Sequence, residues 1–277
     1  MTTPQTWHIS PGREPLDRER LAALDPDLVP GVRVEVVDEV ASTNAEVARR
    51  ALEGAPEGLV VVAEHQSAAR GRLDRRWEAP AGSSLLLSVL LRPTAPTRSW
   101  PWLPLLTGYA VDKTLKAHGY DAGVKWPNDV LIGGRKVAGI LVERLETPTG
   151  PAAVVGIGLN VSLTEDELPV PTATSLALAS GRAPERTGLL VDLLSGLREA
   201  YDAWQAGGDL GGMRLLESYS AACVTLGVEV RVDLPGGEVL RGTAVEIAPG
   251  GRLVVEGPQG RTPVGAGDVV HVRPTGG

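Results

Sequence analysis

A loop rich in arginine is the first segment whose residue types could do chemistry. Residues 66–77, with the sequence QSAARGRLDRRW, contain four arginines opposed by one aspartate and carry a net charge of +3. Guanidinium groups bind phosphate and carboxylate through paired hydrogen bonds, and Trp77 offers a face on which a heterocycle could stack. The composition therefore indicates an anion-binding loop. The charge pattern alone is also consistent with a solvated surface loop.

Two lysine-containing segments follow farther along the chain. Lys125 and Asp129 flank the turn in KWPND, and Lys136 begins the apolar segment KVAGILVE. A lysine at the mouth of a buried strand needs an anionic partner or water, and Gly139 leaves room for a ligand. Strict alternation places Lys136 and Gly139 on opposite faces of the strand. Each residue alone also has a structural explanation, because Lys136 could snorkel at a hairpin end and Asp129 could stabilise a turn.

Taken together and in this order, these segments resemble the bacterial biotin-protein ligases, also called biotin-acetyl-CoA-carboxylase ligases. The matching motifs are at residues 42–44 (STN), 66–77, 125–129 (KWPND), 136–143 (KVAGILVE) and 156–160 (GIGLN). The resemblance extends over residues 32–273. Ala69 and Asp74 depart from it, because the family loop usually has glycine at both positions, and this puts the conformation of the loop in question.

The resemblance implies a two-step reaction. The carboxylate of biotin attacks the α-phosphate of ATP to give biotinyl-5′-AMP and pyrophosphate, and Mg²⁺ is expected to neutralise the leaving pyrophosphate. A lysine of the biotin carboxyl carrier domain of a carboxylase then takes the biotin, and AMP is released.

The resemblance also implies roles for individual residues. The biotin-binding residues would be Ser42, Thr43, Asn44, Gln66, Arg70, Gly71, Arg72, Lys136 and Gly139. The ATP-binding residues would be Arg70, Trp77, Lys125, Asn128 and Asn160. Three residues would be catalytic: Lys136 would hold the carboxylate and α-phosphate oxygens, Arg72 would close over the acyl-phosphate, and Asp129 would orient or deprotonate the incoming amine. We expect no residue to be a direct metal ligand.

The elements that must position these residues follow from hydrophobic periodicity. The pattern predicts strands at residues 32–40, 58–64 and 83–91, and helices at 16–24, 42–54, 103–119 and 186–205. Short strands separated by tight turns over 123–160 indicate antiparallel pairing rather than repeated βαβ units. After Cys223, turns that contain glycine or proline recur every ~8 to 12 residues and predict a small β-barrel or sandwich.

We therefore expect an α/β (α+β) fold in two domains. The resemblance implies a mixed sheet with packed helices, as in class II synthetases, followed by a small SH3-like β-barrel. The expected divisions are a lead segment at 1–31, a catalytic domain at 32–222 and the barrel at 224–273. Some relatives carry an N-terminal winged helix that represses transcription, and residues 1–31 lack the pattern for one, so we expect a ligase without repressor activity.

Composition excludes several other classes of function. The net charge of −7 argues against a nucleic-acid partner. One cysteine and four separated histidines form no metal-ligand cluster in the sequence. The apolar runs are too short for a membrane span and the N-terminus lacks a secretion signal, so we expect no membrane partner and a cytoplasmic location. The oligomeric state stays open, although a homodimer through a sheet edge is one alternative.

Two other functions are compatible with the sequence. A lipoate or octanoate transferase would share the fold and also acylate carrier lysines, although the arginine-rich loop and KWPND favour biotin. A noncatalytic biotin sensor would keep the pocket but lose turnover, and the altered positions Ala69 and Asp74 motivate it. Retention of Lys136, Arg72 and Asp129 argues against the sensor.

Overall fold

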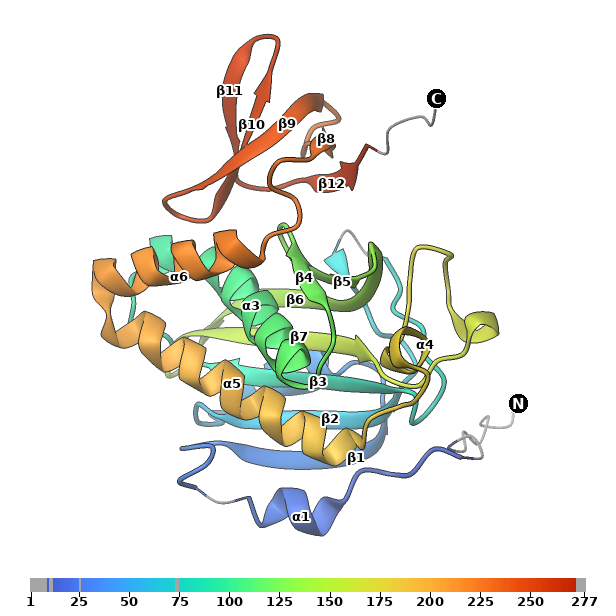
Figure 1. Cartoon of the computed structure of the whole chain (residues 1–277). Helices are drawn as coiled ribbons and strands as arrows, with labels where there is room; N and C mark the ends of the chain where they lie inside the picture. Colours follow the sequence, from blue (N-terminus) through green and yellow to red (C-terminus); the bar gives the residue numbers. More distant parts are fainter. Residues whose placement is uncertain (1–8, 10–11, 25, 73–74, 273–277) are drawn as a thin grey trace, which may run out of the picture.

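A mixed seven-stranded sheet carries helices on both faces and is followed by a five-stranded antiparallel sheet (Figure 1). The structure is a computed structural model that describes residues 9, 12–24, 26–72 and 75–272, with the backbone alone at 209 and 210. The expected α/β domain followed by a small β-domain is therefore present. None of the helices in these described ranges combines the length and apolarity needed to cross a membrane.

The large sheet has the strand order β1-β2-β3-β7-β6-β5-β4. Its strands are β1 Arg33–Val40, β2 Leu59–Gln66, β3 Ser84–Leu91, β4 Ala122–Lys125, β5 Asp129–Ile132, β6 Arg135–Thr147 and β7 Gly150–Asn160. β1 and β2 are parallel because a helix connects them, whereas all other neighbours pair antiparallel. The antiparallel pairing predicted for residues 123–160 is confirmed.

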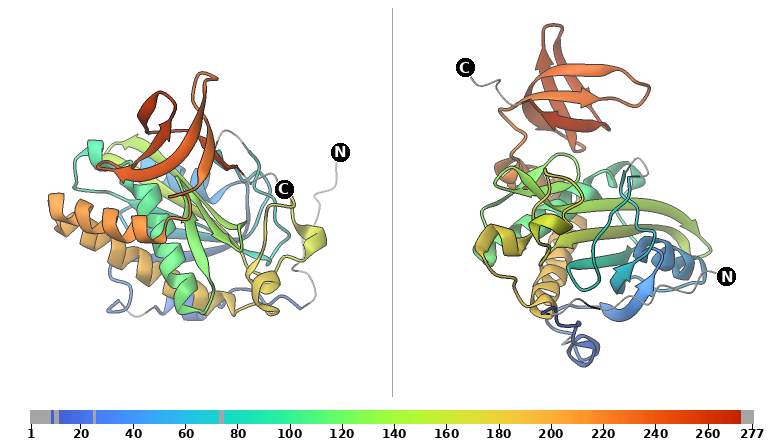
Figure 2. Two further views of the ribbon diagram at one scale, coloured as in Figure 1. Left: turned by 45° about the horizontal axis from the view of Figure 1, so that its top comes forward. Right: turned by 90° about the vertical axis from the view of Figure 1, so that its right-hand side faces the viewer.

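Helices cover the two faces of this sheet unequally. On one face lies α2 (Thr43–Leu52), and on the other lie α3 (Trp102–Ala117), α5 (Arg186–Ala206) and α6 (Gly208–Ala222), as Figure 2 shows. Alternation along β2 explains this division, because Val60 and Val62 join the large core under α3 and α5, while Val61 packs with α2. Two short helices, α1 (Arg18–Ala22) and α4 (Leu176–Ser180), complete the domain.

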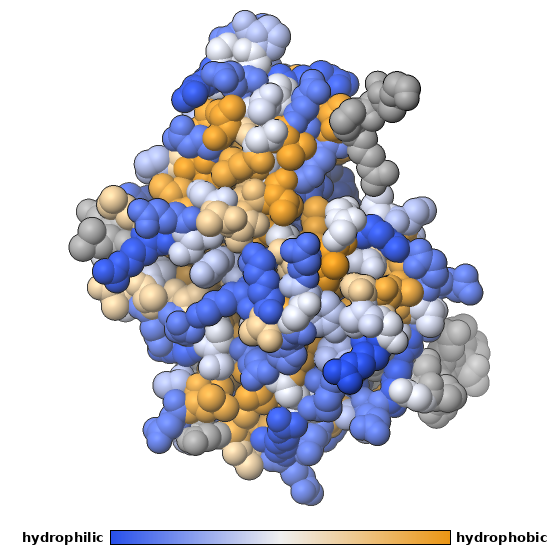
Figure 3. All heavy atoms as spheres, in the orientation of Figure 1, coloured by the Kyte–Doolittle hydropathy of each residue, from blue (hydrophilic) through white to orange (hydrophobic). Residues whose placement is uncertain are grey.

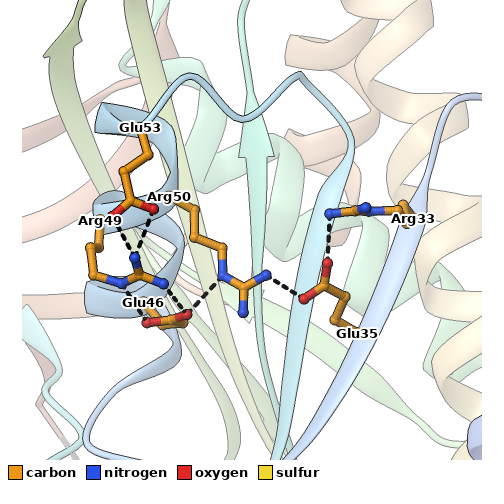
Figure 4. Close-up of polar contacts among 6 residues, drawn as sticks. All are labelled: Arg33, Glu35, Glu46, Arg49, Arg50 and Glu53. Atoms are coloured by element: carbon orange, nitrogen blue, oxygen red, sulfur yellow. Dashed lines mark hydrogen bonds and ion pairs between the residues drawn. The ribbon is translucent and has the colours of Figure 1, made fainter.

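Ion pairs tie α2 to the neighbouring strand β1 (Figure 4). The network consists of Arg33, Glu35, Glu46, Arg49, Arg50 and Glu53. Arg50 bridges the two elements, because its guanidinium contacts both Glu35 of β1 and Glu46 of its own helix. Hydrogen bonds from Arg49 and Arg50 lower the pKa of Glu46 to about 2, so this carboxylate stays ionised in all but strongly acidic solution.

Described residues of the N-terminal segment pack on the large domain, while the division at residue 31 stays a prediction. Leu16, Leu21 and Val29 are buried in the same core as the sheet. A buried ion pair between Glu64 and Arg186, 2.7 Å apart, also holds the backbone of this segment. Glu64 accepts a hydrogen bond from the amide of Leu16 at 2.6 Å, and Arg186 donates to the carbonyl of residue 14 at 2.6 Å.

The C-terminal sheet has the order β11-β10-β9-β8-β12. Its strands are β8 Glu229–Asp233, β9 Val239–Ala248, β10 Arg252–Gly257, β11 Gly260–Val264 and β12 Asp268–His271. This barrel meets the large domain at Trp126, which is only 2% exposed and donates from Nε1 to the carbonyl of Gly251 at 2.9 Å. The amide of Val224 donates to the carbonyl of Val124 at 2.9 Å. The division at residues 222–224 stays a prediction.

Hydrophobic residues gather in the upper part of the face drawn in Figure 3, over the barrel and its joint with the large domain. The exposed large hydrophobic side chains of the C-terminal region include Val224, Val239 and Val270. They are scattered over different elements, and single exposed apolar side chains are common on protein surfaces.

Candidate active site

A cavity opens on the α2 side of the large sheet. The N-terminus of α2, the arginine-rich loop and the strands β3, β6 and β7 contribute to its wall, together with Asn128 before β5. The predicted site residues that line it are Ser42, Thr43, Asn44, Gln66, Arg70, Gly71, Arg72, Trp77, Asn128, Lys136 and Gly139. Three predicted site residues, Lys125, Asp129 and Asn160, lie outside its lining.

The α2 end of the cavity is a hydrogen-bonded group of polar side chains. Gln66 Oε1 accepts from the backbone amide of Thr43 at 2.7 Å. Ser88 Oγ lies 2.8 Å from Thr43 Oγ1 and 2.6 Å from Asn44 Oδ1. Asn44 Nδ2 donates to Glu143 Oε2 at 2.6 Å. Ser42 caps the helix, since its side chain accepts from the amide three residues on.

Glycines in the sheet make room for the side chains of the cavity. A Cβ atom at Gly156 would lie 2.2 Å from Asn44 Oδ1, so only glycine lets Asn44 rest on the sheet here. In the next row, Gly139 and Gly158 pair across β6 and β7, and the indole of Trp77 lies over both. A Cβ at Gly158 would lie 2.6 Å from that indole. Glycine therefore occupies the sheet positions that other side chains approach closely.

Replacement of Gly156 by alanine is expected to weaken binding at the α2 end while leaving the protein folded. The added Cβ forces Asn44 away from Ser88 and Glu143, and each polar group left without its partner costs about 1 to 3 kcal/mol. Calorimetric titration with biotin, the ligand that the resemblance in sequence implies, should show an affinity reduced by roughly tenfold or more.

A matched control is Gly108→Ala in α3, where the nearest contacts of an added Cβ are 3.7 and 3.8 Å away and unstrained. A folded Gly156→Ala protein that binds biotin like the wild type would show that Asn44 has no part in the binding site.

Lys136 lies on the same face of the sheet as Gly139, so the alternation expected from the sequence is wrong here. Val130 and Leu131 are adjacent on β5, but their partners on β6 are Ala138 and Lys136. Val137 is therefore an extra residue on β6. Val137 and Ala138 both join the main core. This β-bulge turns the lysine to the opposite side, into the cavity.

The ammonium of Lys136 has a carboxylate and an aromatic ring as neighbours. Its Nζ lies 2.6 Å from Asp129 Oδ1 and 5.5 Å from the centroid of the Trp77 ring. The Lys136 side chain is 35% exposed and that of Asp129 is 20% exposed, so the pair is partly buried, with Lys136 in the cavity lining and Asp129 beside it. The backbone of Lys136 is fixed as well, because its amide donates to the carbonyl of Thr172 at 2.7 Å.

The arginine-rich loop turns back on itself like a hairpin. The amide of Trp77 donates to the carbonyl of Ala69 at 3.1 Å, and the amide of Gly71 donates to the carbonyl of Arg75 at 2.6 Å. Ala69, one of the two departures from the family pattern, is buried at 5% exposure. Asp74, the other, lies outside the described residues.

Two arginines of this loop contact the barrel. Arg72 donates from Nη1 to Asn128 Oδ1 at 2.9 Å and from Nη2 to the carbonyl of Gly267 at 3.2 Å. Arg75 forms an ion pair with Asp268. Burial lowers the pKa of the Arg72 guanidinium, although an arginine remains charged at physiological pH. The loop therefore connects the cavity to the C-terminal domain.

The remaining predicted residues lie at the border of the cavity or behind it. Lys125 and Asp129 are cross-strand neighbours on β4 and β5. Burial lowers the pKa of the Lys125 ammonium. Asn160 is 4% exposed and donates to the carbonyl of Thr174 at 2.9 Å. Its role in nucleotide binding stays a prediction.

The chain is similar to known proteins over most of its length. The "Biotin/lipoate A/B protein ligase family" matches residues 36–160, and the "Biotin protein ligase C terminal domain" matches residues 225–272. A biotin–[acetyl-CoA-carboxylase] ligase of Mycobacterium tuberculosis is 39% identical over 87% of this chain and 90% of its own length. The chain belongs to the biotin protein ligase family.

Other members of the biotin protein ligase family agree with this assignment. The bifunctional ligase/repressor BirA of Bacillus spizizenii is 33% identical over 86% of this chain and 76% of its own. The structure of a biotin protein ligase from Aquifex aeolicus, in complex with biotin and ATP, is 26% identical and covers 87% of this chain and 98% of that one, with a TM-score of 0.71. The predicted family and fold are confirmed.

Sequence reasoning about this biotin protein ligase missed several residues of the site. Ser88 is fully buried and interrupts the apolar strand β3, and this interruption was the available signal. Glu143 ends the KVAGILVE motif, yet the motif gives it no role. Gly156 and Gly158 belong to GIGLN, and their two-residue spacing puts both on one strand face.

Proposed function

We propose that this chain is an ATP-dependent biotin-protein ligase that forms biotinyl-5′-AMP and transfers biotin to a lysine of a carboxylase carrier domain. The observation that carries the proposal is one cavity with two chemically different ends. Thr43, Asn44 and Gln66 form a neutral polar end, and Lys136 with the arginine loop forms a cationic end. A molecule with a polar ring at one end and a carboxylate on an aliphatic chain at the other would match these two ends of the cavity.

At the cationic end, the first step needs charge stabilisation. The carboxylate oxygen of biotin attacks the α-phosphorus of ATP, and the bond to pyrophosphate breaks. Lys136 is placed to hold the carboxylate and α-phosphate oxygens, and Arg70 and Arg72 supply further cations in the lining. A compact ammonium suits this point, since Gly139 leaves it a narrow space beside the Trp77 ring.

The nucleotide would lie between the loop and the sheet. Trp77 would stack near adenine, while Lys125, Asn128 and Asn160 would border the nucleotide. Among the described residues there is no group of three or more potential metal ligands from His, Cys, Asp and Glu. Mg²⁺ would be held chiefly by the phosphates of ATP, and we expect no direct ligand from the chain. When bound, the ion would neutralise the leaving pyrophosphate.

In the second step, the acceptor lysine must lose a proton before it attacks the acyl carbonyl. Asp129 is paired with Lys136 at 2.6 Å. An acyl-phosphate that draws Lys136 toward itself leaves Asp129 free to accept the proton from the incoming amine. The amine then forms the amide bond, and AMP leaves with the bonding electrons.

Biotin transfer to an isolated carrier domain tests the function. The protein is incubated with ATP, Mg²⁺, biotin and the carrier domain, and intact mass spectrometry should show one biotin increment on the carrier. Omission of ATP should abolish the increment, and replacement of the acceptor lysine by arginine in the carrier should do the same.

Two outcomes would favour the alternatives. Modification by lipoate or octanoate instead of biotin would indicate the related acyltransferase. Biotin binding without pyrophosphate release would indicate a sensor.

The partners of the ligase beyond a carrier domain are part of the proposal. β5 pairs with β6 only as far as Gly139, whereas β6 continues to Thr147. The rest of β6 therefore has an edge on which a second copy of the chain could pair. A homodimer of this kind and a cytoplasmic location follow the expectation from the sequence. Analytical ultracentrifugation with and without biotin and ATP distinguishes the monomer from the dimer.

A further inference from the structure

Four polar side chains at the α2 end of the cavity form a chain of hydrogen bonds with a fixed direction. Its outer end is Glu143, an exposed residue whose ionised carboxylate can only accept hydrogen bonds. Asn44 must therefore turn its amide nitrogen to Glu143 and its Oδ1 to Ser88. This settles an amide orientation that coordinates alone leave ambiguous.

The single proton of Ser88 is then assigned. Asn44 Oδ1 cannot donate, so the contact of 2.6 Å between it and Ser88 Oγ requires the serine proton. Ser88 has no second proton for Thr43 Oγ1, which lies 2.8 Å away. The proton of Thr43 Oγ1 then has two acceptors within reach, Ser88 Oγ at 2.8 Å and Gln66 Oε1 at 3.2 Å. The shorter contact favours Ser88, which gives the order Thr43 to Ser88 to Asn44 to Glu143. Donation to Gln66 would equally leave Thr43 with only lone pairs for a ligand.

This order leaves one acceptor and one donor free at the α2 end of the cavity. Thr43 Oγ1 gives its proton to Ser88 and retains its lone pairs. Gln66 Oε1 accepts from the amide of Thr43 at 2.7 Å, which directs its Nε2 elsewhere. Within the described part of the chain, Gln66 Nε2 has no hydrogen-bond partner. Both residues line the cavity.

We propose that Ser88 and Glu143 are positioning residues that set the hydrogen-bond polarity of the cavity for a cyclic urea edge. A urea presents an N–H beside a C=O, which complements the Thr43 acceptor and the Gln66 donor. The dithiolane ring of lipoate and the chain of octanoate present neither group. The inference rests on the proposed function, since it assigns the ureido ring of biotin to the α2 end.

Biotin analogues test this polarity directly. In each of two cyclic carbamates, one ring N–H of biotin is replaced by oxygen, which converts a donor into an acceptor with little change in shape. Titration calorimetry on the wild-type protein should show that one of the two binds at least about tenfold more weakly than biotin, because its oxygen meets the lone pairs of Thr43.

The variant Glu143→Gln should relax this discrimination. Glutamine can donate as well as accept, so Asn44 can flip at the cost of its long hydrogen bond to the Leu141 carbonyl, at 3.4 Å. Ser88 can then donate to Thr43, and the threonine proton becomes available to the ligand. We expect the affinity ratio of biotin to the disfavoured carbamate to fall at least threefold or so. Ser88→Ala should also weaken biotin binding, since it breaks the same chain.

The chain offers matched controls. Glu146→Gln changes the same residue type on the same strand, where Glu146 pairs with exposed Arg144. Ser84→Ala removes a buried hydroxyl on the same strand as Ser88, and that hydroxyl has no hydrogen-bond partner among the residues that the structure describes. Both controls should keep the wild-type ratio.

The outcomes separate this inference from the proposed function. A wild-type protein that does not bind biotin would overturn the proposed function. Biotin binding with no discrimination against either carbamate would overturn the polarity alone, without any variant. Equal loss of affinity for biotin and both carbamates in Glu143→Gln, with the ratio unchanged, would show that Glu143 has only a structural role.

Discussion

Replacement of Lys136 by alanine is expected to slow the formation of biotinyl-AMP by roughly 100- to 1000-fold without unfolding the protein. The loss of one preorganised donor at a developing charge typically costs about 2.7 to 4 kcal/mol of transition-state stabilisation. The side chain is partly exposed, so its removal does not open the core. Single-turnover measurement of biotinyl-AMP, with circular dichroism to check folding, gives the result.

Arginine at position 136 is not expected to restore activity. A guanidinium is planar and larger than an ammonium, and the space beside Gly139 and Trp77 is narrow. A suitable control is Lys113→Ala. It removes an exposed lysine of α3 that pairs with Glu199 of α5, on the face of the sheet opposite α2. A normal burst of biotinyl-AMP from Lys136→Ala would refute the catalytic assignment.

Replacement of Arg186 by methionine is expected to lower the free energy of unfolding by about 3 to 5 kcal/mol. Removal of one partner leaves the buried carboxylate of Glu64 uncompensated. It also removes a hydrogen bond to the backbone at residue 14, so the N-terminal segment should loosen with the core. Urea denaturation measures the loss, and hydrogen exchange at the Leu16 amide reports the segment.

The exposed ion pair of Arg20 with Glu185 provides the comparison. Both side chains are more than half exposed, and such pairs contribute about 0 to 1 kcal/mol. Arg20→Met should therefore change stability little. If Arg186→Met and Arg20→Met had equal effects, the buried pair would not be what holds the N-terminal segment.

The sequence predicted most of the elements around the site because their patterns are local. Ser42 supplies a helix cap before an amphipathic stretch, and α2 begins there. The strands that contain GIGLN and KVAGILVE are apolar runs between turns, and they pair antiparallel as expected. By contrast, α6 was not predicted, since three glycines near its start, Gly208, Gly211 and Gly212, weaken a helical pattern.

The sequence could not predict the features that depend on pairing between strands. The bulge at Val137 has no local signature, yet it decides which face Lys136 occupies. The buried Ser88 gains its meaning from Thr43 and Asn44, which are more than 40 residues away in the chain. Alternation assumes an unbroken ladder, and a single extra residue defeats it.

The two hydrogen bonds of Arg72 make one guanidinium common to the cavity and the barrel. Thermodynamic reciprocity then applies, because any change that one ligand makes to this contact is returned with equal free energy. If an anion in the cavity draws Arg72 away from Gly267, anion binding weakens the docking of the barrel. Docking of the barrel then lowers the affinity for the anion by the same factor. If the anion leaves Arg72 in place, the two strengthen each other. Either way, a substitution at residues 267–268 can tune substrate affinity from outside the cavity.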